Sequence, residues 1–210
     1  MRRSDRARRV SVNVGAGDGV EVVLPRRAAL READAAVREL RPWIDRRLRA
    51  LEEARIEVGA PAGHVPYLGE HLRLLPQCGR TRAHRRGGVL LVPEEDHLPA
   101  VERWYRRTAR GEIAPRVEAA AAVAGLDYQR LTIRGQKTRW GSCSTTGTLS
   151  FNWRLLLAPE SVLDYVVWHE VCHLRVMDHS PGFWGMLAQH CPAYSAHERW
   201  LRRYGSTLTL

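Results

Sequence analysis

The segment from Pro159 to Val176, PESVLDYVVWHEVCHLRV, constrains the fold more than any other part of the chain. Proline suits the first position of a helix, where its missing N–H costs nothing, and the segment is apolar around most of a helical circumference. It therefore predicts a buried helix. Two histidines and a glutamate would be costly to bury unpaired in such a helix, and a metal ion with its second shell would satisfy them.

His169 and His173 lie four residues apart, so a helix places both on one face, about 6 Å apart along its axis. Both rings can then direct a nitrogen at one ion, at about 2.0–2.1 Å for zinc. Glu170 is displaced by about 100° around the helix, a poor position for a third ligand but a good one for a base acting on a metal-bound water. This H-E-x-x-H spacing recurs in zinc peptidases and predicts a Zn²⁺ cofactor with Glu170 as general base.

A catalytic zinc site needs a third protein ligand and one open position. His179 follows the second histidine at the spacing of the metzincin motif, although Val176 stands where metzincins have glycine. Ser180 can cap a new helix that begins at Pro181, which would hold His179 at a corner facing the metal. The alternative third ligand is Glu198, on the last predicted helix. We predict His179.

The distribution of apolar residues predicts an α+β protein. Alternation around the glycine-rich turn 15–19 predicts a hairpin, and helical spacing predicts a helix over residues 28–55, kinked or broken at Pro42. Residues 1–9 are predicted to be a disordered tail. Further strands are predicted at 64–76, 87–93, 131–135 and 149–157, and a helix at 97–124, interrupted near Gly111 or Pro115. We expect a β-rich N-terminal lobe with one helical element, residues 1–95, followed by a metal-binding catalytic domain, residues 96–210.

The net charge of +10 does not by itself indicate a nucleic-acid partner, because 32 of the 33 basic residues are arginines spread along the whole chain. A solvated basic surface is the favoured interpretation. No run of about 20 apolar residues predicts a membrane span, and the basic start lacks the apolar core of a secretory signal. The cysteines form no C-x-x-C pair, so we expect reduced thiols and a cytoplasmic protein.

Four blocks of sequence, in this order, resemble the YgjP-like predicted zinc metallopeptidases, which are relatives of the SprT-like proteins. The blocks are RWGSCS at 139–144, SFNWRLLLAP at 150–159, LDYVVWHEVCHL at 163–174 and HSPGFW at 179–184. Together they are far more specific than the zinc motif alone, and the similarity is clear over about residues 100–204. The resemblance implies a zincin-like α+β core, with His169, His173 and His179 as ligands and Glu170 as base.

Arg139, Ser142 and Asn152 lie in these blocks near a predicted edge strand, where zincins commonly bind extended peptides by β-augmentation. We expect them to bind substrate, with a structural ion pair as the alternative role of Arg139. The expected function is hydrolysis of a peptide or protein substrate. One alternative is hydrolysis of a phosphoanhydride in a nucleotide; another is a zinc-stabilised module bound to DNA or a protein, against which an intact Glu170 argues.

Overall fold

The computed structural model describes residues 1–15, 19–136 and 138–210, which form two compact units. The first unit comprises Met1–Gly59 and Arg202–Thr209, and the second comprises Ala60–Leu201 with Leu210. Strands between residues 64 and 93 therefore share a compact unit with the H-E-x-x-H segment. The predicted boundary at residue 95, between an N-terminal lobe and a catalytic domain, stays a prediction.

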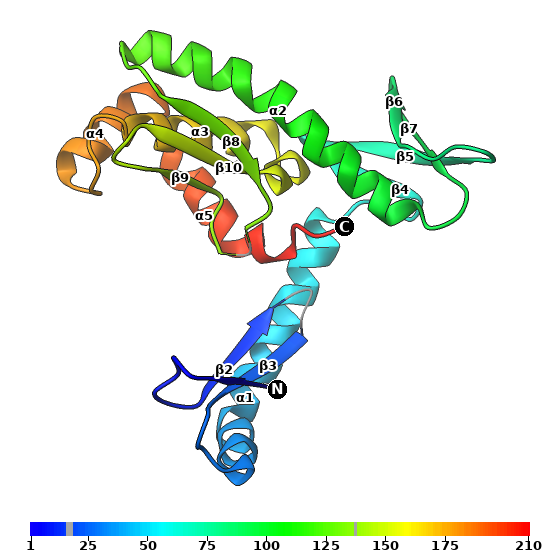
Figure 1. The fold of residues 1–210 in the computed structure, drawn as a ribbon, viewed down its shortest axis with the longest axis vertical. Coiled ribbons are helices and arrows are strands. Elements are labelled where there is room, and N and C mark those ends of the chain that lie inside the picture. The colour runs from blue at the N-terminus through cyan, green and yellow to red at the C-terminus, as the bar shows by residue number, and fades with distance from the viewer. Residues whose placement is uncertain (16–18, 137) are drawn as a thin grey trace. The chain divides into compact units, whose positions relative to one another are not determined.

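The first unit is a small sheet with one long helix, shown in blue and cyan in Figure 1. Its elements are β1 (Arg2–Ser4), β2 (Ser11–Gly15), β3 (Gly19–Pro25), α1 (Leu30–Val58) and η2 (Gly205–Thr207). The strand order is β1-β3-β2, and Val22 and Leu24 of β3 form a small core with Ala33 of α1. The two predicted strands are confirmed, and residues 16–18 of the predicted turn lie outside the described residues. The predicted disordered tail is wrong at Arg2–Ser4, which pairs with β3.

The second unit contains two further sheets and most of the helices. Its strands are β4 (His64–Tyr67), β5 (Glu70–Gln77), β6 (His84–Arg86), β7 (Val89–Pro93), β8 (Arg130–Arg134), β9 (Gly141–Cys143) and β10 (Thr148–Asn152). Its helices are α2 (His97–Ala124), η1 (Trp153–Leu157), α3 (Glu160–Cys172), α4 (Pro181–His190) and residues 194–201 of α5 (Tyr194–Tyr204). The sheet orders are β4-β5-β7-β6 and β8-β10-β9, which confirms the α+β class.

Helices α2 and α3 lie along the three-stranded sheet and enclose the main core (Figure 1). Ile113 and Val117 of α2 and Leu163 of α3 have no exposed surface, and neither does Phe151 of β10. The prediction that the H-E-x-x-H helix is buried is therefore confirmed. No helix among the described residues is long and apolar enough to cross a membrane.

Three local predictions are wrong for identifiable reasons: a break at Pro42, an interruption near Gly111 or Pro115, and a strand that extends to residue 157. A kink at Pro42 stays a prediction. Helices α1 and α2 run on through Pro42 and Pro115. Both prolines are exposed, as are the residues four positions before them, so the carbonyl groups that lose a partner can be hydrated. The strand predicted to extend to residue 157 ends at Asn152, because its side-chain oxygen accepts a hydrogen bond from the Arg154 N–H (3.1 Å) and begins η1.

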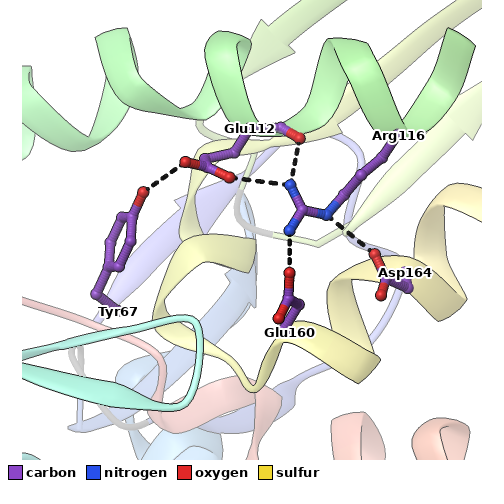
Figure 2. A network of polar contacts seen from close by, with 5 residues as sticks. All are labelled: Tyr67, Glu112, Arg116, Glu160 and Asp164. Atoms are coloured by element: carbon purple, nitrogen blue, oxygen red, sulfur yellow. Dashed lines mark hydrogen bonds and ion pairs between the residues drawn. The ribbon is translucent and has the colours of Figure 1, made fainter.

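A network of charged groups joins α2 to the first turns of α3 (Figure 2). The Arg116 guanidinium donates to the Glu112 carboxylate (2.9 Å), to Asp164 (3.0 Å) and to Glu160. Tyr67 of β4 donates its hydroxyl hydrogen to the other Glu112 oxygen at 2.8 Å. Burial raises the pKa of Asp164, and the charge of Arg116 opposes that rise. One guanidinium thus fixes the start of the helix that carries His169.

We expect Arg116→Met to lower the free energy of unfolding by about 2 kcal/mol, because three carboxylates would be left facing one another without a cation. The partial exposure of Glu160 and Asp164 keeps the effect below that of a fully buried pair. Denaturant unfolding at neutral pH measures it. Arg103→Met, at an exposed position of the same helix, is the matched control and should change stability by less than about 0.5 kcal/mol. Equal effects of the two substitutions would contradict the role given to the network.

Candidate metal centre

Three histidine side chains converge at the end of α3. The Nε2 atoms of His169 and His173 are 3.1 Å apart, and the Nε2 atom of His179 lies 3.1 Å from that of His169. All three residues offer a ligand atom within 4.8 Å of the others. Glu198, the alternative third ligand, is not a member of this group. The structure thus brings together the three histidines that the sequence analysis singled out.

The corner that presents His179 is built by the residues around it. Helix α3 ends at Cys172, four residues before the predicted end at Val176. Helix α4 begins at Pro181 with Ser180 as its N-cap, as the sequence predicts. The Asp178 carboxylate accepts a hydrogen bond from the Ser180 N–H (3.1 Å), and hydrogen bonding to the side chain and then the backbone of Ser180 lowers the pKa of Asp178. This bond fixes the backbone on both sides of His179. The sequence analysis did not identify Asp178, although an aspartate two residues before a helix cap is a usual turn former.

The three rings fit a zinc ion in chemistry and spacing. The Nδ1–H group of His173 donates to the Val176 carbonyl oxygen (2.9 Å), which leaves the Nε2 lone pair directed at the cluster. Burial lowers the pKa of His173, and it lowers the pKa of His169 to about 3, so both rings are neutral, the form that binds a metal. Two nitrogens bound tetrahedrally at about 2.0–2.1 Å lie about 3.3 Å apart, close to the separations seen here.

Packing orients the His169 ring, since its Nδ1 atom is buried and has no hydrogen-bond partner among the described residues. The rings of Phe183 and Tyr165 lie 4.9 and 5.8 Å from it, both edge-on. Trp184 stacks on His179 at 5.5 Å, whereas Trp168 stacks on His190 at 4.3 Å. Aromatic side chains therefore form one wall of the candidate metal centre.

Glu170 lies beside the cluster and is only 5% exposed. Its Oε2 atom is buried without a hydrogen-bond partner within the described part of the chain. Burial raises the pKa of Glu170 to about 8, and the nearby charge of Arg139 works in the opposite direction. A carboxyl group with a pKa near neutrality is suited to exchange protons in catalysis.

A cavity of about 230 Å³ connects these groups to strand β9. The three histidines and Glu170 line it together with Arg139, Met177 and residues 141–143. A larger cavity, about 620 Å³, lies between α2 and β8 and is lined by none of the histidines. Because the smaller cavity holds the candidate ligands and the buried carboxyl group, we assign the functional site to it on chemistry rather than size.

The structure divides the residues predicted to bind substrate. Arg139 and Ser142 line the cavity. Asn152 does not: it is 2% exposed, and its Nδ2 atom donates to the backbone carbonyl oxygens of Gln136 (2.7 Å) and Arg139 (3.2 Å). The amide of Asn152 therefore holds the loop that carries Arg139, and the expected substrate contact of Asn152 stays a prediction. Gly141, which the sequence analysis did not single out, packs directly against Glu170.

An α+β domain with an H-E-x-x-H helix and a third converging histidine belongs to the class of proteins that includes the zinc peptidases. Residues 8–204 match the family model described as "YgjP-like, metallopeptidase domain", and the chain belongs to this family. The resemblance in the four sequence blocks is confirmed, and the match also covers most of the first compact unit. Membership makes the chain a metallopeptidase-family protein.

Two solved structures are also similar to parts of the chain. They are the crystal structures of the metallopeptidase zymogens abylysin, from Pyrococcus abyssi, and jannalysin, from Methanocaldococcus jannaschii. Abylysin is 22% identical, with a TM-score of 0.40, and the alignment covers 44% of this chain and 95% of that one. Jannalysin is 21% identical, with a TM-score of 0.37, covering 41% and 93%. No curated protein sequence matches the chain significantly.

Proposed function

We propose that the protein is a zinc-dependent peptidase in which His169, His173 and His179 hold the metal and Glu170 is the general base. The observation that carries the proposal is the convergence of three histidine side chains beside a buried carboxyl group in one cavity. Three protein ligands leave a zinc ion one open position, which is the arrangement of a catalytic rather than a structural site.

A bound zinc ion would supply a water of lowered pKa and a Lewis acid for the substrate carbonyl. The protein's own contribution is proton transfer by Glu170. Its carboxylate accepts a proton from the attacking water and delivers that proton to the leaving amine. Burial disfavours the charged form of Glu170 and therefore raises its pKa. The carboxylate is then a stronger base toward the attacking water, and the protonated carboxyl group can still donate its proton to the leaving amine.

Strand β9 supports a peptide as the substrate. Among the described strands, its only neighbour is β10, in the sheet order β8-β10-β9. The Trp140 carbonyl oxygen accepts from the Asn152 N–H (2.8 Å), so by the alternation of an antiparallel ladder Ser142 also faces β10. The backbone groups of Gly141 and Cys143 then face the open edge, where an extended peptide can pair by β-augmentation.

Arg139 and Ser142 extend the binding surface from the same edge. Both line the cavity, and the Arg139 guanidinium can donate hydrogen bonds to peptide carbonyl groups. A row of backbone donors and acceptors next to the metal ligands matches an extended polypeptide better than it matches a nucleotide, whose phosphates are usually held by converging cationic or backbone N–H groups. We therefore favour a peptide bond over a phosphoanhydride.

Protein purified without added metal should contain about one equivalent of zinc and should cleave fluorescein-labelled casein. A chelator should abolish cleavage, and added zinc should restore it. Nucleoside triphosphates, assayed in parallel for phosphate release, are the control for the other bond. Phosphate release without casein cleavage would contradict a peptidase, and a zinc content far below one equivalent would contradict the metal site.

A further inference from the structure

We propose that Gly141 is a positioning residue for the reaction: the lack of a side chain at this point of β9 creates the space that Glu170 occupies. The inference rests on the proposed function only for its catalytic consequence. The steric part concerns a contact between β9 and α3, and it can be tested whether or not the protein proves to be a peptidase.

The contact is closer than any side chain allows. A Cβ atom built on Gly141 would lie 2.4 Å from Oε1 of Glu170, 2.6 Å from its Cγ and 2.7 Å from its Cδ. All three separations are far inside the van der Waals contact distance of about 3.5–4.0 Å. Two of the three atoms are carbons of the side chain itself, so rotating the carboxylate alone would not relieve the overlap. Glu170 is 5% exposed, so the cavity that it lines is the space into which it could move, and that movement would take it out of its present position.

Backbone conformation does not explain this glycine. Gly141 does not have a positive φ, and it pairs in register with Phe151 of β10. An alanine could adopt the same extended conformation without strain. The requirement is therefore for space on the side of the strand that faces α3. Side chains alternate along a strand, so Cys143 points to this same side and Ser142 to the other.

The geometry gives a side chain at position 141 two ways to be accommodated, and both alter the site. Either β9 moves away from α3, which displaces the open edge beside the histidines, or Glu170 is pushed out of its place next to them. Displacing a reacting group by about 1 Å can reduce turnover by about a hundredfold. Gly141 thus couples the position of the proposed base to the position of the edge strand.

A double-mutant cycle tests the contact in the zinc-loaded protein. Gly141→Ala is made in three backgrounds: wild type, Glu170→Gln and Glu170→Ala. Gln keeps the shape of Glu170 without its charge, whereas Ala removes the atoms that collide. We expect Gly141→Ala to raise the unfolding equilibrium constant by about 10- to 100-fold in wild type and in Glu170→Gln. In Glu170→Ala the change should be less than about threefold.

Gly185→Ala is the matched control, because a Cβ at this position of α4 would meet no atom within 4 Å. Its effect should be stabilising, because alanine favours a helix more than glycine does, and it should be equal in all three backgrounds. If Gly141→Ala costs as much in Glu170→Ala as in wild type, or costs nothing in wild type, the proposal is overturned. If Gly141→Ala alone fails to fold, folding of the Gly141→Ala/Glu170→Ala double variant supports the proposal, and failure of both opposes it.

The positioning role has its own readout. With fluorescein-labelled casein, Gly141→Ala should keep about one equivalent of zinc and a KM within about twofold of wild type, while kcat falls by about a hundredfold. Full kcat in a variant that keeps its zinc would refute positioning. Absence of casein cleavage by the wild-type protein would instead refute the proposed function and leave the stability cycle as the test of the contact.

Discussion

Replacing Glu170 with glutamine should lower kcat by about 10²- to 10⁴-fold and leave the zinc content unchanged. Glutamine has nearly the same shape, so the close packing against Gly141 should survive. It cannot accept the proton of the attacking water, so general-base assistance is lost. Because burial already favours the neutral form of Glu170, a neutral amide should also not destabilise the fold.

The measurements are kcat on labelled casein and zinc content by elemental analysis. Glu198→Gln is the control, since Glu198 lies outside the group of possible ligands, and it should keep both activity and zinc. Loss of zinc in Glu170→Gln would make Glu170 a ligand rather than a base. Full turnover with zinc retained would exclude the proposed mechanism and favour the alternatives to a peptidase.

Removing His179 should weaken zinc binding more than any other change at the corner between α3 and α4. We expect His179→Ala to lower zinc affinity by more than the roughly 10- to 100-fold that loss of a second-shell partner causes. The reason is that the ion would keep only the two histidines of one helical turn. Since metal binding contributes to stability, the melting temperature of this variant should also respond less to added zinc.

Competition with a chromophoric chelator measures the affinity, and thermal unfolding with and without zinc measures the coupling. Glu198→Ala is compared directly and should bind zinc like the wild type. If Glu198→Ala loses the metal and His179→Ala retains it, Glu198 is the third ligand and the ligand assignment proposed above is wrong.

Features that depend on neighbouring residues could be predicted from the sequence. The helical period fixes the shared face of His169 and His173, and the cap at Ser180 fixes the corner at His179. These relations span at most a few turns of chain, so no knowledge of the tertiary packing was needed. The buried character of α3 followed equally from its composition.

Features that depend on packing between distant segments could not be predicted. The contact of Gly141 with Glu170 joins residues on two elements, and only the approach of β9 to α3 reveals it. Asn152 lies in a block that resembles the family, but whether its amide faces the cavity or the loop behind it is decided by the end of β10 and the start of η1. Whether α1 and α2 continue through their prolines likewise depends on tertiary packing, because it decides whether the prolines and the residues four positions before them are exposed to water.

The position of the histidines at the end of α3 also has an electrostatic consequence. His173 is the C-cap residue of this helix, so the cluster stands where the peptide dipoles of α3 leave a partial negative charge of about half an electron. That end attracts a cation, and Glu160 in the first turn occupies the opposite, positive end. The helix therefore carries complementary charges at both termini once a divalent ion is bound, and loss of the ion would remove the countercharge from its last turn.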